Sequence, residues 1–128
     1  MKLLLDTHLL LWATEKSPRL SAVAAKLIDD PTNEVYFSVA SLWEVTIKHA
    51  KRPAGFKMDP PLFRWALLAN DYSELEIASR HVLAVSRLPP IHSDPFDRLL
   101  IAQAITEGFT LVTTDVKVSK YPGPIRKV

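Results

Sequence analysis

Carboxylates are the side chains of this 128-residue chain whose positions are best suited to chemistry. Asp6 directly follows an apolar run, and Asp115 comes two residues after another such run. Glu44 lies in apolar surroundings within a predicted helix, while Asp94 and Asp97 stand three residues apart where another predicted helix begins. In open parallel sheets the reacting site lies beyond the carboxyl ends of the strands. We therefore expect four separate elements to bring acids to one edge of a sheet.

Several carboxylates within a few ångströms of one another repel, and each raises the pKa of its neighbours unless a cation neutralises them. The chain has no cysteine, which leaves oxygen ligands for an ion held by these acids. Hard divalent cations prefer such ligands, and Mg²⁺ or Mn²⁺ keeps coordinated waters that can meet a substrate phosphate. The acids therefore predict a Mg²⁺ or Mn²⁺ site.

Each of these acids also has a purely structural explanation. Asp6 and Asp94 suit the N-cap positions of the helices that follow them. Glu44 is placed to complete a helix capping box or to form an ion pair with Lys48 four residues later. Asp115 suits a turn. The sequence alone leaves both explanations open for each residue.

Strands and helices alternate along the whole chain. Apolar, β-branched and aromatic runs predict strands over residues 2–5, 34–38, 75–78 and 109–113, with a fifth in the tail at 125–128. Helical spacing and breakers predict helices over 8–15, 21–30, 39–51, 59–70, 79–87 and 94–107, the last ending at Gly108. This alternation predicts a single three-layer α/β domain, residues 1–128, around a parallel sheet.

Composition excludes several classes of protein. Without cysteine the chain has no disulfide, zinc-thiolate site or thiol nucleophile, and a cytoplasmic location fits best. Its three glycines stand alone, which excludes a P-loop and a dinucleotide fingerprint. No apolar run approaches the roughly 20 residues that cross a bilayer. We therefore expect no membrane association.

Basic residues near the acids could guide a phosphate backbone toward them. Lys48 follows Glu44 by one helical turn, and Arg98 adjoins Asp97. His49, Lys51 and Arg52 could extend the track, although an ordinary solvated face explains all five basic residues equally well. The formal net charge of +2 by itself indicates only mild affinity for polyanions.

At these residues the sequence resembles the PIN-domain ribonucleases, most closely the VapC-type toxins of toxin–antitoxin pairs. The resemblance covers essentially the whole chain and is carried by LLLDTH, SLWEVTIKH, DPFDRLLIAQA and LVTTD, in the family's order and spacing. It places Asp6, Glu44, Asp97 and Asp115 at the family's four acidic metal-site positions. Thr113 takes the place of the small hydroxyl residue that supports the acids.

The resemblance implies a metal-dependent endoribonuclease with four to five parallel strands between helices. It further implies a homodimer, an RNA target that varies between members, and neutralisation by a small antitoxin protein. Asp94 falls outside the acidic quartet and is counted, with Thr7 and Thr113, as a supporting residue.

Two other functions remain as alternatives. An aspartate-dependent phosphohydrolase also begins with a strand that ends in Asp, but its acid–base residue would be an Asp at the position of His8. A non-catalytic, Mg²⁺-binding signalling module needs an acceptor Asp after a middle strand, whereas the second predicted strand ends at Ser38 with no acid adjacent.

Overall fold

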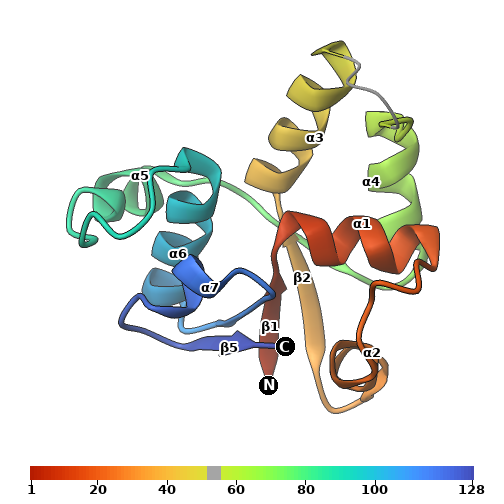
Figure 1. Ribbon diagram of the computed structural model, residues 1–128, viewed down its shortest axis with the longest axis horizontal. Helices are drawn as coiled ribbons and strands as arrows, with labels where there is room; N and C mark the ends of the chain where they lie inside the picture. The colour runs from red at the N-terminus through yellow and green to blue at the C-terminus, as the bar shows by residue number, and fades with distance from the viewer. Residues whose placement is uncertain (52–55) are drawn as a thin grey trace.

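The computed structural model describes residues 1–51 and 56–128 (Figure 1). Within these ranges five strands form one parallel sheet, in the order β3-β2-β1-β4-β5. The strands are β1 (Lys2–Leu5), β2 (Glu34–Ser38), β3 (Ser73–Leu75), β4 (Thr110–Thr113) and β5 (Ile125–Lys127). The helices are α1 (Thr7–Glu15), α2 (Ala22–Asp29), α3 (Val39–Lys51), α4 (Pro60–Ala69), α5 (Ser79–Val85), α6 (Pro95–Glu107) and α7 (Val116–Ser119). The predicted three-layer α/β fold with a parallel sheet is confirmed.

The central strand β1 is buried on both faces because successive side chains of a strand point to opposite sides of the sheet. Leu3 and Leu5 belong to one core with side chains of α1, α2 and α4. Leu4 belongs to a second core, built mainly by α6 with side chains of β4 and α7. Figure 1 shows α1, α2 and α4 on one side of the sheet and α5, α6 and α7 on the other. An apolar run without alternation is thus the pattern that this position requires.

The helix ends follow the predicted local chemistry. Asp94 caps α6, because its Oδ1 accepts hydrogen bonds from the backbone N–H groups of Phe96 and Asp97. Pro95 occupies the first turn, and Gly108 ends the helix with a φ of 74°. That left-handed conformation favours glycine.

One predicted strand was misplaced, and one helix was not predicted. The third strand runs over Ser73–Leu75 and not over 75–78, because its partner β2 ends at Ser38, opposite Leu75, where the chain turns into α3. The four-residue helix α7 was not predicted, since so short a segment has no helical periodicity. In the described ranges no helix is both long and apolar enough to cross a membrane.

The sheet order brings the ends of β1 and β4 together. Leu5 pairs with Val112, and the N–H of Asp6 donates to the carbonyl of Val112 at 3.1 Å. Asp6 and the residues that follow β4 therefore meet at one edge of the sheet. On the other side of β1, β2 leads directly into α3, which carries Glu44 to the same edge.

Candidate metal centre

Asp6 is buried at the end of β1 and accepts hydrogen bonds at both carboxylate oxygens. Its Oδ1 accepts from Leu9 N at 2.9 Å, which caps α1, and its Oδ2 accepts from Thr113 Oγ1 at 2.6 Å and from Thr114 N at 3.4 Å. Burial raises the pKa of Asp6, although these hydrogen bonds and nearby His8 oppose the rise. The cap that the sequence suggested is present, and so is a buried carboxylate whose ionised form is costly.

Glu44 reaches the same edge from the second turn of α3. Its Oε1 lies 2.7 Å from Thr7 Oγ1, and its Oε2 forms an ion pair with Lys48 Nζ at 3.2 Å. Thr7 Oγ1 also lies 2.9 Å from Ser41 Oγ, so Ser41 faces Thr7 inside the helix instead of forming a capping box with Glu44. Thr7 therefore connects the start of α1 to α3.

The pKa of Asp97 is also strongly raised. Burial, followed by repulsion from Asp94 and Glu44, raises the pKa of Asp97 to about 7. The carboxylate of Asp6 adds to this rise, whereas His92 opposes it. Acids from the end of β1, from α3 and from the start of α6 thus act electrostatically on Asp97.

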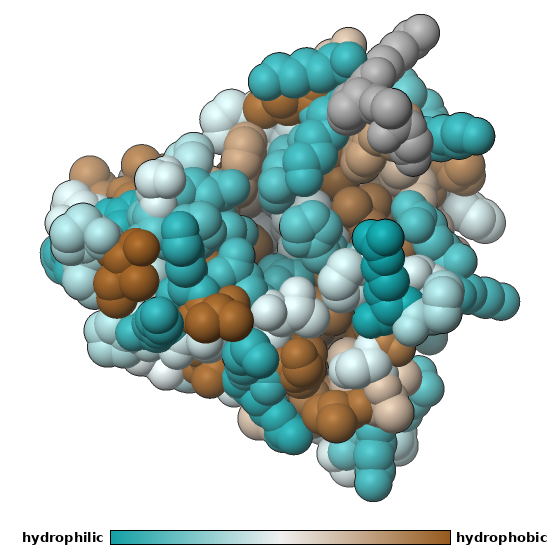
Figure 2. All heavy atoms as spheres, in the orientation of Figure 1, coloured by the Kyte–Doolittle hydropathy of each residue, from teal (hydrophilic) through white to brown (hydrophobic). Residues whose placement is uncertain are grey.

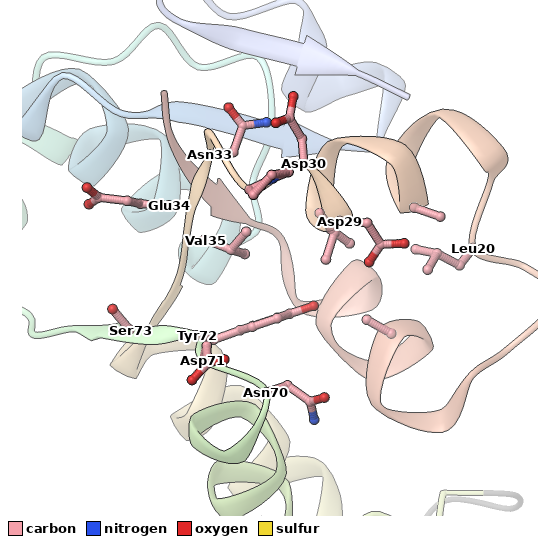
Figure 3. Close-up of a pocket in the computed structure, with 14 residues that line it drawn as sticks. Leu20, Asp29, Asp30, Asn33, Glu34, Val35, Asn70, Asp71, Tyr72 and Ser73 are labelled. Atoms are coloured by element: carbon pink, nitrogen blue, oxygen red, sulfur yellow. The ribbon is translucent and has the colours of Figure 1, made fainter.

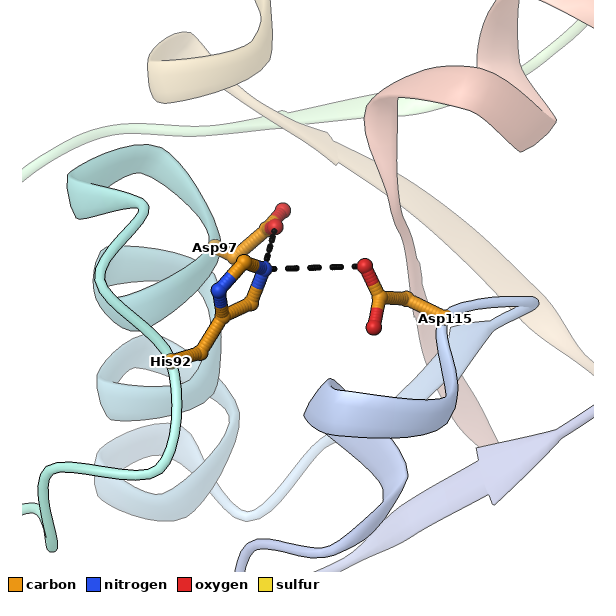
Figure 4. Close-up of side chains that lie close together, drawn as sticks. All are labelled: His92, Asp97 and Asp115. Atoms are coloured by element: carbon orange, nitrogen blue, oxygen red, sulfur yellow. Dashed lines mark ion pairs between the residues drawn. The ribbon is translucent and has the colours of Figure 1, made fainter.

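Asp115 approaches Asp97 from the loop after β4, with His92 between them (Figure 4). Asp115 Oδ1 caps α7 by accepting from Lys117 N at 2.7 Å, while Oδ2 lies 3.5 Å from His92 Nε2. The same Nε2 lies 2.9 Å from Asp97 Oδ2. The hydroxyl of Thr113 joins this group to the first strand, because it accepts from Asp115 N at 3.0 Å and donates to Asp6.

Among the described residues, His92, Asp97 and Asp115 offer ligand atoms within 4.8 Å of one another. Asp6 and Glu44 stand outside that tight group, although both are close enough to Asp97 to raise its pKa. No pattern in the sequence indicated His92 as a residue of this site. A signal for it was its position two residues before the helix cap Asp94, yet a histidine in a loop has no periodicity that indicates its direction.

The predicted basic residues differ in their surroundings. Lys48 and His49 are half-buried and Lys51 is exposed in the last two turns of α3. On the face that Figure 2 displays, hydrophilic side chains gather over the region between α3 and α6. Arg52 lies outside the described residues.

Arg98 is held inside the protein. Its Nη1 donates to the carbonyl of Pro89 and to the hydroxyl of Tyr121, both at 3.0 Å, and its Nη2 donates to the carbonyl of Val85 at 3.2 Å. These bonds attach α6 to the segment after α5. They favour a structural role for Arg98 over the RNA contact that the sequence suggested.

A cavity of about 600 Å³ lies away from these acids, where β2 and β3 begin (Figure 3). The connections that lead from α2 into β2 and from α4 into β3 line it. Burial and the nearby carboxylate of Asp29 raise the pKa of Tyr72, one of its lining residues, to about 12. None of the residues that line this cavity is Asp6, Glu44, His92, Asp97 or Asp115. The cavity is therefore separate from the candidate metal centre.

The acidic group has the donors that a hard divalent cation requires. Its oxygens come from carboxylates. Burial raises the pKa of Asp6, and burial together with the charges of Asp94, Glu44 and Asp6 raises the pKa of Asp97. A divalent cation would offset the cost of ionising these carboxylates. The residues present therefore fit such an ion.

Comparisons with known proteins identify the family of the chain. A family model described as the PIN domain matches residues 3–124. Ribonuclease VapC22 of Mycobacterium tuberculosis is 28% identical over 127 residues, which span 95% of each chain. The fold is similar to a chain of VapBC2 from Rickettsia felis, solved with a DNA fragment from its promoter, with a TM-score of 0.72, 18% identity and coverage of 99% of this chain and 98% of that one. It is also similar to a chain of DNA-bound VapBC from Salmonella typhimurium, with a TM-score of 0.68, 16% identity and the same coverages. This chain belongs to the PIN domain family.

Proposed function

We propose that this protein is a metal-dependent endoribonuclease that hydrolyses RNA phosphodiester bonds in the cytoplasm. The observation that carries the proposal is that Asp6 after β1, Glu44 on α3 and Asp94 at the start of α6 lie close enough to Asp97 to raise its pKa, with Asp115 beside it. The similarity of this chain's sequence to that of a ribonuclease, over 95% of the chain, supports the same chemistry.

In this proposal Asp6, Glu44 and Asp97 hold Mg²⁺ or Mn²⁺. A bound divalent cation lowers the pKa of a coordinated water and offsets the charge that develops on the phosphoryl oxygens. Asp115 orients the attacking water or contributes to a second ion. Thr113 contacts both Asp6 and the backbone of Asp115. It thereby fixes the positions of the two acids relative to each other.

Thr7 and Asp94 support the acids from outside the group that holds the ion. The Thr7 hydroxyl fixes one oxygen of Glu44, and Asp94 sets the first turn of α6, on which Asp97 lies. Lys48 and Lys51 supply positive charge at one end of α3, beside the acids, and His49 lies between them in the helix. These cations offset the repulsion that an acidic site exerts on RNA phosphates.

We further propose that the protein is the toxin of a toxin–antitoxin pair and forms a homodimer. Its structural neighbours were solved as VapBC complexes. Exposed apolar side chains on α4 support a protein partner, because Leu62, Trp65 and Leu68 are 57%, 66% and 40% exposed. Light scattering should give twice the chain mass, and a small protein encoded beside the gene should copurify and block cleavage.

Cleavage of RNA by the purified protein tests the main proposal. With Mn²⁺ or Mg²⁺ present we expect internal cuts, and EDTA should stop them. Asp97→Asn should abolish cleavage because it removes a carboxylate that binds the ion. Asp59→Asn makes the same chemical change at the exposed cap of α4 and should cleave like wild type.

Mapping the ends of the RNA fragments would also identify the target sequence. Cleavage that persists in EDTA, or that Asp97→Asn leaves intact, would refute the metal-dependent mechanism. Trapping of a phosphoryl group on Asp6 would favour a phosphohydrolase instead. That alternative lacks its second acid, because His8 occupies the required position and stacks on Trp12 with ring centroids 5.8 Å apart. Metal binding without cleavage of any RNA would favour the non-catalytic module.

A further inference from the structure

The two ring nitrogens of His92 face different surroundings. One faces the carboxylates of Asp97 and Asp115, and the other is buried without a hydrogen-bond partner among the described residues. Its Nε2 lies 2.9 Å from Asp97 Oδ2 and 3.5 Å from Asp115 Oδ2 (Figure 4). Its Nδ1 is buried and has no hydrogen-bond partner among the described residues. The two nitrogens therefore have very different surroundings.

This asymmetry identifies the tautomer of the imidazole. A buried N–H without an acceptor is costly, so the proton belongs on the nitrogen that faces a carboxylate. The ring then carries a proton on Nε2, which faces Asp97 Oδ2 at 2.9 Å and lies farther, at 3.5 Å, from Asp115 Oδ2. If Nε2 bound a metal ion, the proton of the ring would lie on Nδ1, which has no acceptor among the described residues.

The backbone of His92 is held by a second set of hydrogen bonds. The Tyr121 hydroxyl accepts from His92 N at 2.7 Å and donates to His92 O at 3.2 Å. It also accepts from Arg98 Nη1 at 3.0 Å, so its one proton and both lone pairs are used. Arg98 in turn donates to Pro89 O at 3.0 Å. The segment that carries His92 is therefore fixed against α6 and against Tyr121, two residues after α7.

We propose that His92 is a positioning residue of the metal centre and not a ligand, a proposal that rests on the proposed function. Its Nε2–H faces Oδ2 of Asp97 and thereby orients the carboxylate, leaving Oδ1 for a cation. Tyr121 and Arg98 act through His92 by fixing its backbone. Partners of this kind typically change metal affinity by about 10–100-fold when they are removed.

Binding of Mn²⁺, followed by electron paramagnetic resonance of the full-length protein, tests this role. His92→Leu, which lacks the donor, and Tyr121→Phe, which releases the backbone of His92, should each weaken Mn²⁺ binding about 10–100-fold. His92→Gln places an amide N–H near the position of Nε2 and should restore binding to near the wild-type value. Tyr36→Phe removes a hydroxyl whose hydrogen bond to Glu34 is exposed, and should bind Mn²⁺ like wild type.

Electron spin-echo envelope modulation of the Mn²⁺-loaded wild type distinguishes a positioning residue from a ligand. We expect no modulation from a coordinated ¹⁴N nucleus. A ¹⁴N signal that His92→Leu abolishes would make His92 a ligand and overturn the proposal. Unchanged Mn²⁺ affinity in both His92→Leu and Tyr121→Phe, or equal weakening in His92→Gln and His92→Leu, would also overturn it.

The same measurements separate this inference from the proposed function. If the wild type binds Mn²⁺ with the predicted dependence on His92 but cleaves no RNA, the positioning role stands and the nuclease proposal fails. If RNA is cleaved while the His92 variants bind Mn²⁺ as tightly as wild type, the nuclease proposal stands and the positioning role fails. Circular dichroism of each variant checks that the fold is retained, and His92→Gln tests the donor should His92→Leu not fold.

Discussion

Asp97 shows how burial and charge act together at a single residue. Its carboxylate is 22% exposed and its pKa rises to about 7, first because of burial and then because Asp94 and Glu44 repel its ionised form. Asp6 is shifted in the same direction by burial. Without a cation, the ionised form of Asp97 is therefore less stable in the folded protein than in the unfolded chain, where water solvates the charge. This is the electrostatic cost that a bound divalent ion would offset.

Asp97→Asn should therefore stabilise the metal-free protein, in a manner that depends on pH. Between about pH 4 and pH 7 the folded protein keeps a proton on Asp97 that the unfolded chain has released. Wild-type stability consequently falls as the pH rises through this interval, and the loss is complete above pH 7. The melting temperature of the variant, measured in EDTA, should exceed that of wild type most above pH 7 and converge with it toward pH 4.

Asp59→Asn is the matched control for this experiment. It makes the same substitution at an exposed helix cap, away from the other acids, and its difference from wild type should stay small at every pH. A melting temperature for Asp97→Asn well below that of wild type above pH 7 would mean that the carboxylate is structural.

Helix α6 is the element on which most of the site depends. Asp94 caps its start, Asp97 lies in its first turn, and Arg98 attaches it to the preceding segment. Deeper in the helix, buried Gln103 accepts a hydrogen bond from Ser38 and donates to the carbonyl of Glu76 at 3.2 Å. These bonds position α6 relative to the ends of β2 and β3, and therefore position Asp97 relative to Glu44 on α3.

Gly108→Ala tests the end of this helix. Gly108 has a φ of +74°, and within residues 1–51 and 56–128 no atom beyond its own chain neighbours lies within 4 Å of the position that a Cβ would occupy. The cost is therefore backbone strain without a clash, about 1–2 kcal/mol of unfolding free energy. Gly108→Asn should cost less, because asparagine tolerates the left-handed region better. Denaturant unfolding of both variants checks this, and equal stability of the alanine and glycine proteins would contradict it.

At the scale of the whole molecule, charge is distributed unevenly. The net charge is only +2, yet Lys48, His49 and Lys51 lie together at one end of α3, close to the acids. Figure 1 places α2, which carries Lys26, at the far end of the molecule from α3. RNA affinity should therefore depend on which lysine is removed and much less on the total charge.

Lys48→Ala should weaken RNA binding and reduce its dependence on salt. If Lys48 contacts one phosphate of a single strand, the slope of log affinity against log salt should become shallower by about 0.7. Fluorescence anisotropy in the Asp97→Asn background measures binding without cleavage. Lys26→Ala removes an equal charge from an exposed position on α2 and should leave the slope unchanged. Equal slopes for the Lys48 variant and wild type would remove Lys48 from the RNA path.

Much of the fold could be predicted because its signals are local. The apolar run before Asp6 has the composition of a strand buried on both faces, and Asp94, Pro95 and Gly108 specify the ends of α6 by their own conformational preferences. The third strand was misplaced because its length depends on where β2 ends, and that information lies in another part of the chain.

The sequence by itself determined which residues could do chemistry and that strands and helices alternate, since residue type, spacing and caps act over a few neighbouring positions. Only the tertiary structure decided which of those residues meet. It turned Arg98 inward onto backbone carbonyls, placed His92 against Asp97, and left Asp6 and Glu44 outside the tightest group of ligand atoms. Such encounters depend on the order of strands in the sheet and on hydrogen bonds between distant segments, which no local pattern of side chains encodes.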